Sequence, residues 1–203
     1  AMGASYRRIE VESIEQLVGA GVYYGGPTSE APGLVGRDVF IVGGANSAGQ
    51  AAIHLARYAK QVTLVVRADS IRAGMSEYLA REVEATDNIE VLTSTAVVDG
   101  GGNGRLEHIV LRDLRTDTDR TVDAQALFLL IGAKPKTEWL PDTIERDAQG
   151  FIVTGNDLDP AGRWPLDLAP FLLETSMPGV FAAGDVRHGG VRRVASAVGE
   201  GSI

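Results

Sequence analysis

Residues 37–60, RDVFIVGGANSAGQAAIHLARYAK, form a short apolar run that ends in two glycines and leads directly into a helical pattern. Apolar residues without alternation predict a strand that is buried on both faces. Small and apolar residues at helical spacing follow from position 46, which predicts a helix packed on that strand. A buried strand that turns at glycine into a helix is typical of an α/β fold with a parallel sheet.

The next segments repeat this alternation. QVTLVVR, residues 61–67, predicts a second buried strand, and IEVLTS, residues 89–94, predicts a third. Between them, residues 75–88 predict an amphipathic helix with Ser76 as a candidate cap and with Tyr78, Leu79 and Val83 on or near the apolar face. Strand, helix, strand, helix and strand in this order predict the Rossmann-like, three-layer mononucleotide-binding half of a doubly wound sheet.

The second half of the chain changes character. Residues 95–125 alternate apolar and polar side chains and are interrupted by glycines, which predicts a small antiparallel β-meander. Residues 126–135 return to a buried strand, and 150–155 and 178–186 predict two further strands. The last residues, 194–203, predict the first turns of a helix.

Charge and composition exclude several classes of function. The net charge of −8 argues against a broad nucleic-acid-binding face, because phosphate affinity needs clustered Lys and Arg. No apolar run approaches a membrane span and no secretion signal is evident, so a cytoplasmic protein is expected. The sequence contains no cysteine, which excludes disulfides and thiol chemistry within these residues. His54, His108 and His188 lie far apart in sequence, so no metal site is expected.

The glycine turn is the first candidate binding site. A helix that starts directly after a strand leaves N–H groups that bind a pyrophosphate. Alanine replaces the middle glycine of the G-x-G-x-x-G/A pattern; it is tolerated if the turn has a negative φ there, and it weakens or shifts the phosphate contact if φ is positive. The candidate residues are Gly43, Gly44, Ala45, Asn46, Ser47 and Ala48.

Two arginines follow the second strand, where the adenosine ribose of a bound dinucleotide would lie. Arginine at this position accommodates a 2′-phosphate, whereas an acidic residue would accept a hydrogen bond from the 2′-hydroxyl. Arg67 and Arg72 therefore favour NADPH, although NADH remains possible and both arginines could simply be solvated surface residues.

Together, the motifs 21–26 (GVYYGG), 37–67, 131–140 (IGAKPKTEWL) and 178–203 (PGVFAAGDVR to the end) resemble the thioredoxin reductase-like branch of the pyridine nucleotide-disulfide oxidoreductase family. The resemblance covers essentially the whole chain. It implies an FAD-dependent NAD(P)H oxidoreductase in which NADPH passes a hydride to FAD. It also implies an NAD(P)H-binding domain over 22–140, with segments 1–21 and 141–203 belonging to a partial FAD-binding domain of α/β fold.

The resemblance assigns further site residues. The family's 2′-phosphate motif, His-Arg-Arg-x-x-x-Arg, retains only Arg67 and Arg72. Asp185 corresponds to the residue that accepts a hydrogen bond from the flavin's ribitol, although it could instead be a turn or capping residue. The remaining residues are expected beside the nucleotide (Ile131, Gly132) and along the flavin (Gly184, Arg192, Arg193, Val194).

One motif of the family is missing. The Cys-x-x-Cys of thioredoxin reductases falls on residues 25–29, GGPTS, which contain no thiol. The electron acceptor therefore stays open between ferredoxin-like proteins, quinones, oxygen and an acceptor with its own disulfide, such as a thioredoxin. The resemblance also implies a homodimer for the full-length parent.

No general acid, general base or other catalytic side chain is predicted, since the cofactors carry the redox chemistry. The chain is interpreted as a fragment that is inactive and colourless by itself. The alternative hypothesis is a nucleotide-sensing or vestigial binding module without redox turnover.

Overall fold

The structure is a computed structural model of the chain and describes residues 3–26, 30–159, 162 and 164–203. The chain divides into two compact units. One unit comprises residues 8–132, and the other combines 1–7 with 133–203. These bounds differ from the predicted range 22–140. Ile14, which precedes that range, is fully buried in the core of the first unit. Residues 133–135 pair with an N-terminal strand of the second unit.

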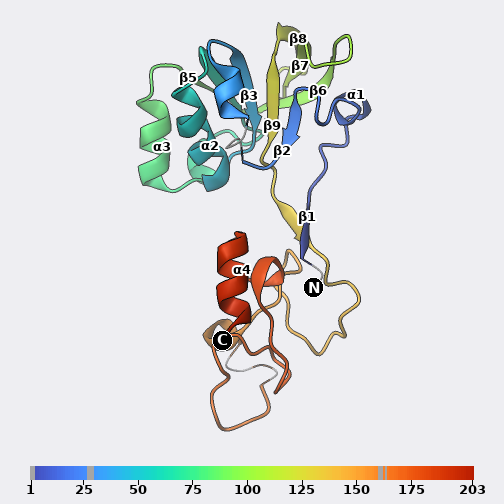
Figure 1. Cartoon of the computed structure of the whole chain (residues 1–203), viewed down its shortest axis with the longest axis vertical. Helices are drawn as coiled ribbons and strands as arrows, with labels where there is room; N and C mark the ends of the chain where they lie inside the picture. The colour runs from blue at the N-terminus through green and yellow to red at the C-terminus, as the bar shows by residue number, and fades with distance from the viewer. Residues whose placement is uncertain (1–2, 27–29, 160–161, 163) are drawn as a thin grey trace. The chain divides into compact units, whose positions relative to one another are not determined.

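The unit of residues 8–132 is built on a five-stranded parallel sheet in the order β2-β9-β3-β4-β5 (Figure 1). The central strands lack polar alternation because both faces are covered. The strands are β2 (Val22–Tyr24), β3 (Asp38–Val42), β4 (Gln61–Val65), β5 (Ile89–Leu92) and β9 (Ala126–Leu129).

Helices cover one face of this sheet and a meander covers the other, which makes three layers (Figure 1). The helical layer contains η1 (Ala31–Leu34), α2 (Asn46–Ala56), η2 (Ile71–Ala73) and α3 (Glu77–Glu84). The opposite layer contains α1 (Glu12–Glu15) and the antiparallel strands β6 (Thr95–Gly101), β7 (His108–Asp113) and β8 (Thr118–Asp123). The predicted Rossmann-like fold with its meander is confirmed.

Helix α3 departs from the sequence prediction in two details. Leu79 and Val83 are buried as expected, but Tyr78 is 76% exposed, because at 3.6 residues per turn it lies on the side of the helix opposite the buried residues Leu79, Ala80 and Val83. Ser76 occupies the N-cap position, yet its side chain makes no capping hydrogen bond.

The second unit contains little regular structure. It has the antiparallel pair β1 (Ala4–Tyr6) and β10 (Ala133–Pro135), the short helices η3 (Gly155–Asp157) and η4 (Gly184–Val186), and α4 (Val194–Gly201). The prediction of strands over 150–155 and 178–186 is wrong. Ile152 and Phe181 form only isolated bridges, because the backbone of these segments bonds to loops rather than to a neighbouring strand. Their apolar side chains instead fill a small core around Ile152 and Ala182.

Candidate nucleotide-binding site

The predicted nucleotide-binding segments lie at one edge of the parallel sheet. Segments 43–48, 67–74 and 130–132 follow β3, β4 and β9, which are neighbours with the same direction (Figure 1). Ligands of doubly wound sheets bind at this carboxyl edge. The fold therefore brings together three stretches that are far apart in sequence.

Gly43 makes the closest approach between two of these stretches. Its φ is +149°, and a Cβ added there would lie 2.5 Å from the carbonyl oxygen of Leu130 and 3.1 Å from the Cβ of Ala48. The Leu130 N–H donates to the Val42 carbonyl at 2.9 Å. The turn thus packs against the chain immediately before Ile131 and Gly132.

The start of α2 can accept an anion. The N–H groups of Ala48 and Gly49 donate to the Ala45 carbonyl, whereas those of Asn46 and Ser47 have no acceptor among the described residues. Both residues are exposed. Free N–H groups at the positive end of a helix bind phosphate groups. The residues present therefore fit a pyrophosphate.

Alanine at the middle position of the turn is compatible with this site. Ala45 has φ −103° and ψ 178°, which is ordinary extended backbone. The missing glycine does not strain the turn.

The loop after β4 packs on the turn, a contact that the sequence does not reveal. A Cβ added to Gly74 would lie 3.0 Å from the Gly44 carbonyl oxygen, and one added to Gly44 would lie 2.8 Å from Val66. The Ser76 N–H donates to Asn46 Oδ1 at 2.8 Å. The Asn46 side chain therefore holds the loop, while its backbone N–H stays available.

The two arginines of this loop differ in their surroundings. Arg67 is exposed and has no ion-pair or hydrogen-bond partner among the described residues. Arg72 donates to both carboxylate oxygens of Glu84 and to Glu77. The hydrogen bond to Glu84, helped by the charge of Glu77, raises the pKa of Arg72. These two glutamates were not predicted as site residues, although their spacing of seven residues on one helix indicates a common face.

The second unit holds the residues predicted to contact a flavin. Gly184 has φ +76°, and the neighbouring Asp185 is half-buried with no hydrogen-bond partner among the described residues. An unpartnered carboxylate fits a hydroxyl donor such as ribitol. The guanidinium carbon of Arg192 lies over the ring of Phe151, 4.5 Å from the ring centroid. Arg193 is the N-cap residue of α4, and Val194 is exposed.

The turn at Gly184 is fixed by a largely buried ion pair. Glu200 of α4 accepts hydrogen bonds from the Gly184 N–H at 2.6 Å and from Arg187 at 2.5 Å, and both charged side chains are only 17% exposed. The hydrogen bond from Arg187, followed by that from Gly184, lowers the pKa of Glu200 below its ordinary value of 4.5. Glu200 therefore ties η4 to α4.

Replacing Glu200 by alanine is expected to accelerate amide exchange at Gly184. Loss of a hydrogen bond to a charged group costs roughly 2 kcal/mol, which corresponds to about 30-fold faster exchange. The pKa of Glu200 is lower in the folded state than in the unfolded chain. Its stabilising effect is therefore complete at a pH above the ordinary pKa of 4.5 and is lost as the pH falls through the pKa of the folded state. Amide exchange at Gly184 is measured by NMR and corrected for the intrinsic rate. Its protection should fall at acidic pH in the wild type but not in Glu200→Ala. Equal protection of Gly184 in both proteins would contradict the role of Glu200.

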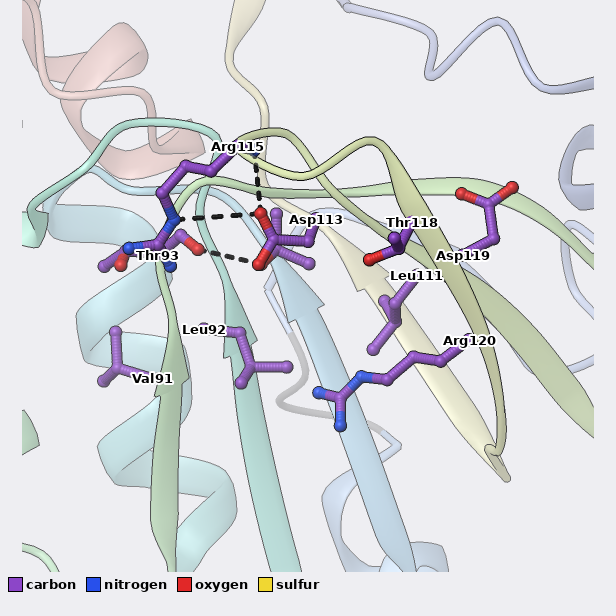
Figure 2. A pocket seen from close by; sticks show the side chains of 10 residues that line it. Val91, Leu92, Thr93, Leu111, Asp113, Arg115, Thr118, Asp119 and Arg120 are labelled. Carbon is purple, nitrogen blue, oxygen red and sulfur yellow. Dashed lines mark hydrogen bonds and ion pairs between the residues drawn. The ribbon is translucent and has the colours of Figure 1, made fainter.

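A separate cavity of about 290 Å³ lies beside the end of β5 and the β7–β8 hairpin (Figure 2). Several of its charged side chains are already paired, since Asp119 binds Arg112 at 2.7 and 2.8 Å and Asp113 accepts from the Arg115 N–H. None of the predicted site residues lines it. The cavity is not part of the candidate nucleotide site.

Metal binding and membrane insertion find no support within the described ranges. No group of His, Asp and Glu side chains there could hold a metal ion. None of the helices that the structure describes has the length and apolar character needed to cross a bilayer.

Comparison with known proteins identifies the family. Residues 1–201 match the pyridine nucleotide-disulphide oxidoreductase family. The chain is 34% identical over its whole length to a subunit of the alkyl hydroperoxide reductase of Pseudomonas putida and 30% identical to thioredoxin reductase of Treponema pallidum. The crystal structure of T. acidophilum thioredoxin reductase superposes on 98% of the chain with a TM-score of 0.75 and 27% identity.

These similarities extend over only part of each relative. The chain spans 36% of the Pseudomonas protein, 60% of the Treponema protein and 60% of the T. acidophilum chain. The match nevertheless covers both compact units and the glycine turn. The chain belongs to the pyridine nucleotide-disulphide oxidoreductase family and resembles its thioredoxin reductase-like members.

Proposed function

We propose that residues 8–132 bind a reduced pyridine nucleotide at the carboxyl edge of the sheet, and that the whole protein is a thioredoxin reductase-like flavoprotein oxidoreductase. The observation that carries this proposal is the start of α2, where the N–H groups of Asn46 and Ser47 have no acceptor among the described residues and are exposed. When bound, the nicotinamide and flavin groups supply hydride transfer from NADPH to FAD, and the protein binds and orients them.

Each candidate residue has a defined role in this proposal. The N–H groups of Asn46 and Ser47 bind the pyrophosphate, and Gly43 lets segment 131–132 approach the nucleotide. Arg67 and Arg72 favour a 2′-phosphate. In the second unit, Asp185 accepts a hydrogen bond from a flavin hydroxyl.

The flavin-contacting roles of the second unit rest on the family resemblance and on the local geometry. Gly184 has a positive φ and lies against Ala197 of α4, and the exposed residues Arg192, Arg193 and Val194 lead into the same helix. We propose that this segment lines the flavin in the whole protein, which is expected to be a homodimer.

Cysteines of this chain cannot relay electrons to the acceptor of the whole protein, because the chain has none. The sequence contains no thiol, and residues 27–29 of the segment aligned with the family's Cys-x-x-Cys lie outside the described residues. We propose an acceptor that brings its own redox group, such as a thioredoxin or a ferredoxin-like protein.

Calorimetric titration of the chain with NADPH and NADH tests the proposed binding. We expect a Kd of about 1 mM or tighter for at least one of them, in the range of typical substrate affinities. Adenosine monophosphate serves as the control and should bind more weakly, because it lacks the pyrophosphate. Failure of both dinucleotides to bind would refute the proposed function, and equal binding of adenosine monophosphate would refute the role of the turn.

A further inference from the structure

We propose that Glu84 is a specificity-determining residue that competes with the 2′-phosphate of NADPH for Arg72 and so narrows the preference for NADPH over NADH. This inference rests on the proposed nucleotide site. It assigns a function to a carboxylate on α3 that is remote in sequence from the glycine turn.

Arg72 is held by two carboxylates along one face of α3. Its terminal nitrogens donate to the two oxygens of Glu84 at 2.5 and 2.8 Å, and its Nε donates to Glu77 at 3.1 Å. Glu77 also accepts from Arg81 at 2.8 Å, so it is shared between two arginines. Glu84 is therefore the dedicated partner of Arg72, in the bidentate geometry that an arginine also uses for phosphate.

The position of Arg72 is fixed relative to the phosphate-binding turn. Its N–H donates to the Ser70 side chain at the start of η2, and the loop that follows is tied to the turn through the bond from Ser76 to Asn46. Gly74 lies against the Gly44 carbonyl. The backbone is thus placed for a contact with bound nucleotide, while the guanidinium group is engaged elsewhere.

The charges of the ion-pair cluster that contains Arg72 cancel. Arg72 and Arg81 are balanced by Glu77 and Glu84, so the cluster offers an incoming phosphate no excess positive charge. Arg72 and Glu84 are both 44% exposed, so their ion pair is weak enough to exchange for another anion. A 2′-phosphate must displace Glu84 to reach Arg72, whereas the 2′-hydroxyl of NADH does not need to do so.

The test compares the dissociation constants of NADPH and NADH for the wild type and Glu84→Gln. We expect the variant to bind NADPH about fivefold more tightly, in proportion to the strength of an exposed ion pair, with NADH unchanged within about twofold. Glu90→Gln is the matched control, because it removes one exposed carboxylate of the same unit that makes no contact with Arg72.

A double variant shows whether Glu84 acts through Arg72. In the Arg72→Ala background, Glu84→Gln should leave both affinities unchanged. Thermal unfolding of each variant checks that α3 remains folded.

The outcomes separate this inference from the proposed function. If the wild type binds dinucleotides but Glu84→Gln does not change the ratio of the two dissociation constants, the role of Glu84 is wrong while the binding site stands. A change that persists without Arg72, or one that Glu90→Gln reproduces, would also overturn it. Absence of dinucleotide binding to the wild type overturns both proposals.

Discussion

Replacing Gly43 by alanine is expected to destabilise the unit of residues 8–132 by about 3 kcal/mol or more and to abolish nucleotide binding. The added Cβ would lie 2.5 Å from a backbone oxygen of Leu130 and 3.1 Å from the Cβ of Ala48. Neither neighbour is the flexible end of a side chain, so β9 or α2 must shift. The positive φ of Gly43 adds backbone strain. Urea unfolding followed by circular dichroism measures the loss.

Gly36→Ala is the matched control for this variant. Gly36 also has a positive φ, +72°, but nothing lies within 4 Å of an added Cβ. Its replacement should cost only about 1 kcal/mol of backbone strain. If both variants lost the same stability, the close approach of the turn to Leu130 would not be what constrains position 43.

Ser47→Glu is expected to weaken dinucleotide binding about 100-fold without destabilising the fold, because its carboxylate would repel the pyrophosphate. Ser47 is exposed in the first turn of α2, where an acidic side chain interacts favourably with the helix dipole. The unfolding midpoint should therefore stay equal or rise slightly, while the Kd measured by calorimetry increases.

Gln50→Glu introduces the same charge one turn further along α2, also at an exposed position. It should leave binding nearly unchanged, since the helix-terminal N–H groups lie before it. Equal effects of the two substitutions would indicate a general charge effect rather than an anion site at the start of α2.

The parallel sheet and the helices that cover it were predictable from sequence, because strands and helices differ clearly in their hydrophobic pattern. The buried runs 38–42 and 61–65 have no polar alternation, and 46–56 has helical spacing with small residues. Local pattern and tertiary burial agree in these segments. The turn was predictable for the same reason, since glycine, a short apolar strand and a helix start coincide there.

The errors concern segments whose conformation depends on distant partners. GFIVTG has the composition of a strand, but Ile152 bonds to Val186 and His188 in a single bridge rather than in a ladder. Tyr78 was misplaced for a different reason: at 3.6 residues per turn it lies on the side of α3 opposite Leu79, Ala80 and Val83.

The partners of Arg72 could not be found from the sequence around it. Glu84 is the last residue of α3 and lies twelve residues after Arg72, which belongs to η2. The two side chains meet only once η2 has folded against α3. The sequence therefore identified the arginine as a candidate phosphate ligand but missed the carboxylates that occupy it. Contacts between segments such as this one cannot be read from a local motif.

The binding of a pyridine nucleotide at the turn after β3 is tested most directly by amide chemical-shift mapping. The isotope-labelled chain is titrated with NADPH, and the backbone amide shifts are recorded residue by residue. We expect the largest shifts at Gly44–Ser47, with smaller ones at Arg67 and Gly132. Chemical-shift changes confined to residues that line the cavity between β5 and the β7–β8 hairpin would contradict binding at this turn. The absence of any change at high NADPH concentration would contradict it as well.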